Sequence, residues 1–152
     1  MTLSQKETTL LNDLKGQEQL CIEKYTKYAA QAKAPELSKL FGALADVERG
    51  HLSMVNDLLA GKTVTPPAAG SSPLSSCSTA SVGYADEQSK KQDAFLCADM
   101  LATEKHVSSV YDTGIFEFTD PQARKALNHI QSDEQGHGLK LYDYMSANGM
   151  YQ

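Results

Sequence analysis

Hydrophobic residues recur every three or four positions along most of the chain, which is the spacing of one buried helix face. This spacing predicts two long helical segments, separated by a stretch of different composition. Proline divides each segment, because Pro35 and Pro121 suit the first turn of a helix and not its middle. We therefore expect four helices, at about residues 4–33, 36–60, 88–118 and 121–147.

The connections between these helices determine the expected fold. Short turns join the helices within each segment, so the chain should form two antiparallel hairpins, at about 4–60 and 88–147. Residues 61–87 are rich in proline, serine and glycine, which indicates a loop. This loop is long enough to run the length of a bundle, so the second and third helices can be parallel. The predicted fold is one all-α domain, residues 1–152, built as a four-helix bundle with a long crossover.

Composition and charge narrow the function classes. The chain has 152 residues, a formal net charge of −5 and no basic cluster, so nucleic acid is not an expected partner. Neither a secretory signal nor an apolar run of about 20 residues is present, so we expect a cytoplasmic protein that does not bind membranes. The three cysteines show no Cys-x-x-Cys spacing, which argues against a disulfide framework and a zinc ribbon.

The two hairpins repeat each other when residue 18 is aligned with residue 104. This alignment runs without a gap over 43 positions and contains eight identities. The identical pairs are Glu18/Glu104, Tyr25/Tyr111, Pro35/Pro121, Lys39/Lys125, Glu48/Glu134, Gly50/Gly136, His51/His137 and Asp57/Asp143. Glutamate, tyrosine, glycine and histidine make up most of these pairs. A chance alignment of two helical segments would more readily pair leucine with leucine or alanine with alanine. The pattern indicates a duplicated functional hairpin.

Each half carries a Glu-x-x-His motif on its second helix and a glutamate thirty residues before that motif. Positions three apart share one helix face, so the glutamate and histidine of each motif can reach the same small volume. Both motifs lie within the apolar row of their helix. The candidate metal ligands are Glu18, Glu48, His51, Glu104, Glu134 and His137.

Four carboxylates and two imidazoles would therefore point into the core of a small bundle. Burying unpaired carboxylates costs several kcal/mol or forces their protonation, and no lysine or arginine occurs in those rows. Two divalent cations would neutralise them. A glutamate from each of two helices and Glu-x-x-His from the other two is the ligand set of di-iron and di-manganese carboxylate bundles. The expected cofactor is two Fe ions, although Mn and Zn also suit these ligands.

Other residues on the same rows admit more than one interpretation. Tyr25 and Tyr111 lie two turns beyond Glu18 and Glu104, where they could be hydrogen-bond donors to a ligand carboxylate, redox-active phenols or ordinary core residues. Gly50 and Gly136 lie inside the two motifs, where each lowers the stability of its helix by about 1 kcal/mol relative to alanine. They indicate either close approach of a neighbouring helix or room beside the metals. His106 and His129 fall off the rows and are expected at the surface, and the cysteines are expected to be structural thiols.

The C-terminal segment "MLATEKHVSSVYDTGIFEFTDPQARKALNHIQSDEQGHGLKLYDYMSANGMYQ", residues 100–152, resembles the spore coat protein F (coat F) family of endospore-forming bacteria. The ligand pattern is similar to that of ferritin-like proteins of the bacterioferritin and rubrerythrin kind. The resemblance, over about three-quarters of the chain, implies a ferritin-like fold and association with the spore coat. By analogy with ferritin-like sites, Glu48 and Glu134 bridge two metals. Glu18 and His51 then complete one metal site, and Glu104 and His137 complete the other.

Two functions follow as hypotheses. The first is a di-iron oxidoreductase resembling a peroxidase or ferroxidase, with O₂ or peroxide as substrate. The second is a structural spore coat component whose metal site is stabilising, filled by zinc or vestigial. Expected partners are a second copy of the chain or spore coat proteins. A bare helical interaction module would leave the buried carboxylates unexplained.

Overall fold

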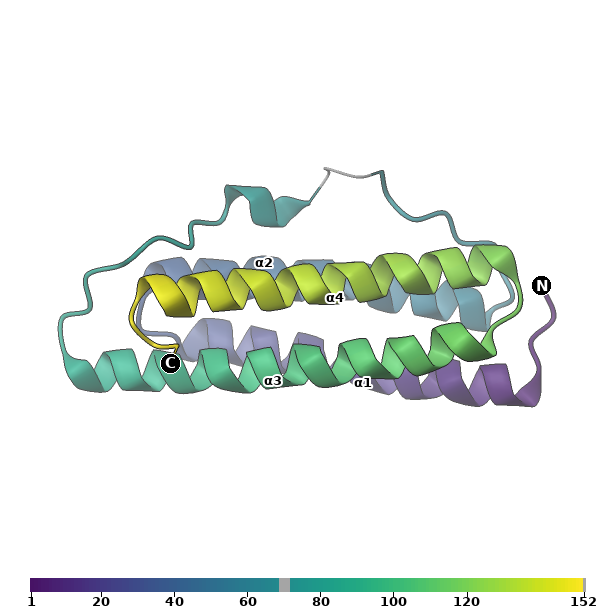
Figure 1. The fold of residues 1–152 in the computed structure, drawn as a ribbon, viewed down its shortest axis with the longest axis horizontal. Helices are drawn as coiled ribbons and strands as arrows, with labels where there is room; N and C mark the ends of the chain where they lie inside the picture. Colours follow the sequence, from purple (N-terminus) through teal and green to yellow (C-terminus); the bar gives the residue numbers. More distant parts are fainter. Residues whose placement is uncertain (69–71, 152) are drawn as a thin grey trace.

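The computed structural model describes residues 1–68 and 72–151 and consists of four long helices, as predicted (Figure 1). The helices are α1 (Gln5–Gln31), α2 (Pro35–Leu59), α3 (Glu87–Glu117) and α4 (Pro121–Ala147), with a short 3₁₀ helix, η1 (Pro73–Ser76), in the crossover. The described residues contain no β-strand. The prediction of an all-α four-helix bundle is therefore confirmed, with helix ends within about two residues of those expected.

Local chemistry explains where the helices begin and end. Ser4 and Glu7 form a capping box at the start of α1, each side chain bonding to the backbone N–H of the other. Helix α1 ends at Gln31, two residues before the predicted end. Ala32 and Ala34 leave the helical conformation, with ψ of 136° and 125°, and Pro35 disfavours a helical conformation at Ala34. At the start of α4, the Asp120 carboxylate accepts a hydrogen bond of 2.8 Å from the backbone N–H of Ala123.

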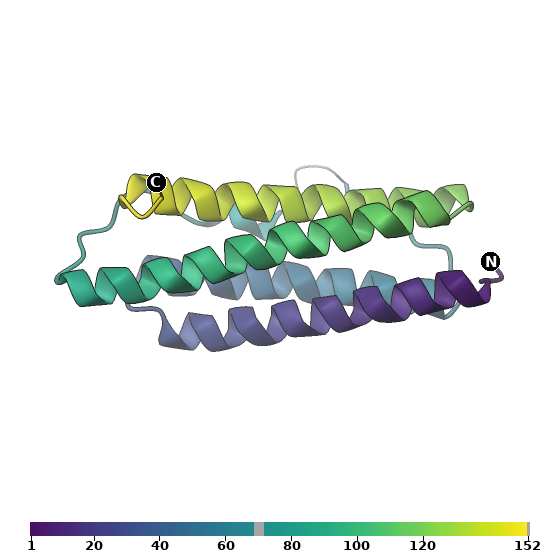
Figure 2. The same cartoon turned by 60° about the horizontal axis from the view of Figure 1, so that its bottom comes forward.

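The chain direction places parallel helices on the diagonals of the bundle. α1 pairs with α2 and α3 pairs with α4 as antiparallel hairpins, and α2 and α3 run in the same direction (Figures 1 and 2). The crossover returns along α2 and α4. Asp93 of α3 anchors the turn between α1 and α2, because its buried carboxylate accepts hydrogen bonds from the backbone N–H groups of Lys33 and Ala34 and from the Tyr84 hydroxyl.

Two apolar clusters fill the bundle, one toward each end. One contains Phe41, Met100 and Tyr144, and the other contains Leu11, Leu58 and Ile130. A layer of buried polar side chains lies between these clusters. The apolar residues shield this layer from water at both ends of the bundle, so charges within it interact strongly.

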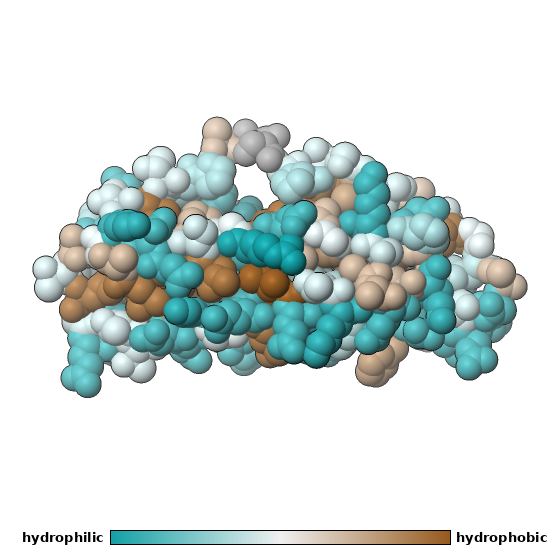
Figure 3. All heavy atoms as spheres, turned by 180° about the vertical axis from the view of Figure 1, so that it is seen from behind, coloured by the Kyte–Doolittle hydropathy of each residue, from teal (hydrophilic) through white to brown (hydrophobic). Residues whose placement is uncertain are grey.

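The outer surface is mainly polar. The face seen from behind shows hydrophilic side chains with smaller hydrophobic patches between them, and it is hollowed beneath the crossover (Figure 3). Within residues 1–68 and 72–151, no helix has both the length and the apolar character that a bilayer span requires.

Candidate metal centre

The six residues predicted as metal ligands converge in the buried polar layer. Each is at most 2% exposed to solvent. They form two groups of four, and within each group one possible ligand atom per residue lies within 4.8 Å of the others. The groups are Glu18, Glu48, His51 and Glu134, and Glu48, Glu104, Glu134 and His137. The two groups share Glu48 and Glu134, which is the arrangement that two adjacent ions with bridging carboxylates require.

Both imidazoles turn the same nitrogen toward the carboxylates. His51 Nδ1 lies 3.1 Å from Glu48 Oε2 and 3.0 Å from Glu134 Oε1. His137 Nδ1 lies 2.9 Å from Glu48 Oε1 and 3.2 Å from Glu104 Oε1. The rings are stacked, with centroids 5.7 Å apart and planes 16° from parallel. Because both Nδ1 atoms face one carboxylate cluster, each could bind a metal there.

The two tyrosines join the hairpins crosswise. The hydroxyl of Tyr25 on α1 donates to Glu104 Oε1 on α3, and the hydroxyl of Tyr111 on α3 donates to Glu18 Oε1 on α1, both at 2.5 Å. Burial, reinforced by the nearby glutamates, raises the pKa of each tyrosine well above its usual value. Both side chains are therefore neutral phenols that hold a carboxylate in place.

The carboxylates cannot all ionise easily without a cation. Burial, with the neighbouring carboxylates, raises the pKa of Glu18 and that of Glu134 well above the usual range. Burial also acts to raise the pKa of Glu48. Hydrogen bonds from the protonated Glu18 carboxyl and from the imidazoles of His137 and His51 outweigh it and hold this pKa well below the usual range.

Ionising the whole cluster leaves three buried oxygens without a donor among the described residues: Oε2 of Glu18, Glu104 and Glu134. In the same part of the chain, no lysine or arginine forms a hydrogen bond or ion pair with any of the four glutamates. Buried anions are normally paired or coordinated to metal. The donor set therefore fits two divalent cations held by oxygen and imidazole nitrogen.

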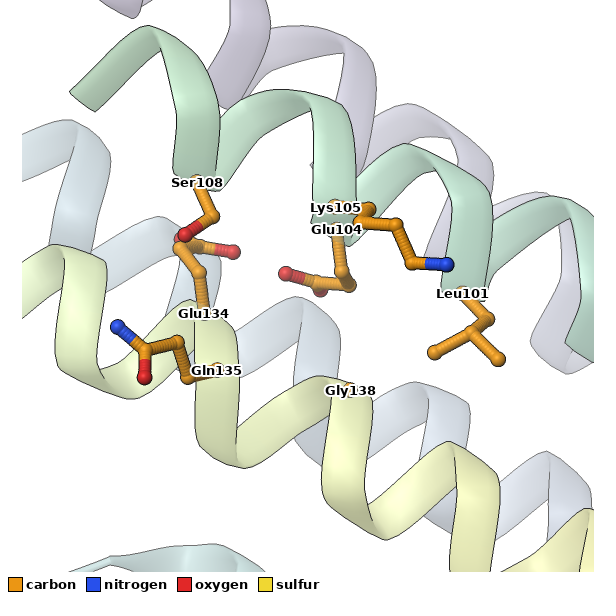
Figure 4. Close-up of a pocket in the computed structure, with 7 residues that line it drawn as sticks. All are labelled: Leu101, Glu104, Lys105, Ser108, Glu134, Gln135 and Gly138. Atoms are coloured by element: carbon orange, nitrogen blue, oxygen red, sulfur yellow. The ribbon is translucent and has the colours of Figure 1, made fainter. Parts of the chain in front are cut away.

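Two openings lead toward the cluster. A cavity of about 270 Å³ between α3 and α4 is lined by Glu104 and Glu134, whose side chains point into it beside Leu101 and Lys105 (Figure 4). A larger cavity of about 840 Å³, the crossover cavity, lies between α2, α4 and the crossover, and both ligand histidines line it. A small molecule could therefore approach the cluster from two sides.

The paired glycines also line the crossover cavity. A Cβ built at Gly50 or at Gly136 would meet no atom within 4 Å, apart from its chain neighbours and its own helix backbone. Close approach of a neighbouring helix is therefore excluded as the reason for these glycines. The other interpretation, room beside the site, agrees with the cavity.

One residue beside the site escaped the sequence analysis. Asp133 Oδ2 lies 2.8 Å from His51 Nε2 and 3.3 Å from Nε2 of His129, which was expected at the surface but has a side chain only 26% exposed. Asp133 precedes Glu134 directly, but nothing in the sequence indicates a partner on another helix. Burial acts to lower the pKa of His51, but hydrogen bonds to Asp133 and Glu48 outweigh it and raise this pKa to about 9.

The three cysteines are buried and free. Burial raises the pKa of Cys97 to about 12 and that of Cys21, which lies closer to the glutamates, further above the usual range. Neither thiol is a reactive thiolate near neutral pH. This agrees with the prediction that the cysteines are structural.

Comparison with protein families finds a match to part of the chain. Residues 92–152 match the model of a protein family described as Coat F domain. No curated protein and no solved structure matches the chain. The match covers most of α3 and all of α4, with Glu104, Glu134 and His137, but not the first hairpin. It supports a relationship to spore coat F proteins over less of the chain than the predicted three-quarters.

Proposed function

We propose that this chain is a ferritin-like, spore-coat-related protein that holds a dinuclear metal centre, with iron as the metal, and that it reacts with O₂ or peroxide. The observation that carries the proposal is the pair of buried four-residue groups that share Glu48 and Glu134. The Coat F match supports the link to the spore coat.

The ligands divide between two metal positions. The first position has Glu18 and His51 as its own ligands, and the second has Glu104 and His137, while Glu48 and Glu134 contribute to both. Each tyrosine bonds to Oε1 of its glutamate, which leaves Oε2 of Glu18 and of Glu104 as the oxygen available to a metal. The tyrosines therefore orient the ligand carboxylates.

Two bound iron ions would supply electrons to O₂ or peroxide. The protein's own residues define the conditions for that reaction. The apolar clusters shield the centre from water at both ends of the bundle, and the cavity between α3 and α4 gives a small oxidant a path to Glu104 and Glu134. Tyr25 and Tyr111 are the nearest phenols, so they are also the candidates for oxidation beside the centre.

Metal analysis followed by iron loading tests this function. Protein purified without chelator should bind two metal ions per chain, and Fe(II) added in air should be oxidised with consumption of O₂. Glu48→Ala and Glu134→Ala should lose most of the metal, because each removes a ligand of both positions. Glu23→Ala is the matched control, because Glu23 is an exposed helix residue whose ion pair, within the described part of the chain, is with Lys27. Unchanged metal content in the first two variants would refute the site.

The second candidate function is a structural coat component that binds zinc or other metal only for stability. The Coat F match favours it, because a coat protein need not have a reaction. This candidate predicts metal binding and a higher melting temperature with metal, but no O₂ or peroxide consumption after iron loading. The loading experiment therefore separates the two functions.

A further inference from the structure

The inner surfaces of the two metal positions are nearly equivalent. In each, a histidine Nδ1 faces the shared carboxylates, and a tyrosine from the other hairpin donates to the glutamate that belongs to that position alone. The internal repeat explains this equivalence. Any difference in metal affinity must therefore come from residues around the ligands.

The outer nitrogens of the two histidines differ. His51 Nε2 lies 2.8 Å from Asp133 Oδ2. Nε2 of His137 is buried and has no hydrogen-bond partner among the described residues.

The repeat identifies the missing partner. The alignment of residue 18 with residue 104 places Val47 opposite Asp133, so the second position has a valine where the first has a carboxylate. Val47 and His137 line the same crossover cavity. At the outer nitrogens of the two histidines, the repeat thus differs by one aligned pair, Asp133 and Val47.

We propose that the two metal positions are unequal, with Asp133 making the first position the tighter one and His137 making the second the weaker and more readily exchanged. This inference rests on the proposed dinuclear centre.

A metal on Nδ1 requires the imidazole proton to sit on Nε2. At the first position Asp133 accepts that proton in a hydrogen bond, which fixes the tautomer and makes Nδ1 a stronger donor. At the second position the same proton would be buried with no acceptor among the described residues.

The size of the effect can be estimated. Loss of a hydrogen-bond partner of a metal-ligating histidine typically lowers metal affinity about 10- to 100-fold. The first metal should therefore occupy the position of Glu18 and His51, and the position of Glu104 and His137 should fill only at higher metal concentration. Two dications repel each other, so the second ion binds more weakly than the first even if the two positions are identical. The test of the inference is therefore which position the first ion occupies.

Co(II) is a suitable probe, because its visible absorption reports binding. Crystals of the wild-type protein grown with one equivalent of Co(II) should show anomalous scattering mainly between Glu18 and His51. In solution, Asp133→Ala should lower the Co(II) affinity of the tighter binding step about 10- to 100-fold and leave the affinity of the weaker step nearly unchanged. Val47→Asp supplies the absent carboxylate and should tighten the weaker step.

Asp143→Ala is the matched control, because it removes an acidic side chain from the same cavity and leaves the hydrogen bonds that the described residues make to His51 and His137 in place. In this variant the Co(II) affinities of both binding steps should change little. Equal occupancy of both positions at one equivalent, or an equal loss at both steps in Asp133→Ala, would overturn the inference alone. A wild-type protein that binds no Co(II) would overturn the proposed centre with it. If Asp133→Ala does not fold, the inference is still tested by the occupancies in the wild-type crystals and by the Co(II) affinities of Val47→Asp.

Discussion

Replacing Gly50 and Gly136 by alanine should stabilise the metal-free protein. Both glycines lie in the interior of a helix, where alanine is favoured by about 1 kcal/mol. A new Cβ at either position would meet no atom within 4 Å outside its chain neighbours and its helix backbone, so no steric penalty offsets this gain. The two gains should add, because the new methyl groups disturb no shared contact.

The expected change in melting temperature follows from the size of the protein. Unfolding entropy is about 2.1 cal/mol/K per residue, so for this chain 1 kcal/mol corresponds to a shift of about 3 °C. Each substitution should therefore raise the melting temperature by about 3 °C, and the double variant by about 6 °C. The measurement is thermal unfolding by circular dichroism in the presence of a chelator.

Two further glycines calibrate this experiment. Gly42 lies in the same helix as Gly50, outside the crossover cavity, and its Cβ would also meet no atom within 4 Å, so Gly42→Ala should give the same gain. Gly149 has φ +66°, so Gly149→Ala should lower the melting temperature. A gain in Gly42→Ala with a loss in Gly50→Ala would show that the glycine supports the fold, and the explanation by room beside the site would fail.

Three further predictions concern the site and its support. Tyr25→Phe and Tyr111→Phe should each lower the free energy of unfolding by about 1–3 kcal/mol in urea titrations, because each removes the phenol that donates to a buried carboxylate oxygen, whereas Tyr151→Phe at the surface should have no effect. The pKa of His51 and that of His137 rise from 6.5 to about 9 on folding, so their contribution to stability is complete below pH 6.5 and is lost as the pH rises through 9. Since metal ions replace these protons, the gain in melting temperature on adding Zn(II) should increase between pH 6.5 and about 8.5, and a constant gain would contradict the reasoning. Asp93→Ala should lower the free energy of unfolding by about 3 kcal/mol relative to exposed Asp112→Ala, because it removes the acceptor of two backbone N–H groups.

Local signals account for the part of the fold that could be predicted. The limits of α4 agree with the predicted ones because Asp120 and Pro121 mark the start of a helix within a few residues of chain. The short 3₁₀ helix η1 was not predicted, since its four residues form no apolar period. The parallel arrangement of α2 and α3 followed from loop lengths alone.

Symmetry of the sequence accounts for the part of the site that could be predicted. Glu48 and Glu134 stood out because the repeat placed them in matched motifs on the buried face of their helices. Asp133 did not stand out, because its counterpart in the repeat is a valine and its partner His51 lies on another helix. Contacts between helices depend on how the hairpins are rotated against each other, and the hydrophobic period does not specify that rotation.

The crosswise tyrosine bonds have a consequence for how such a protein can be assembled. Each hairpin supplies the phenol that orients a carboxylate of the other, so neither hairpin by itself contains a complete half of the centre. Two copies of one hairpin, related by a twofold axis, would supply the same six ligands and the same pair of hydroxyl donors. The crossover then acts as a tether that makes a two-chain association intramolecular. It also allows the two halves to differ, as they do at Asp133 and Val47.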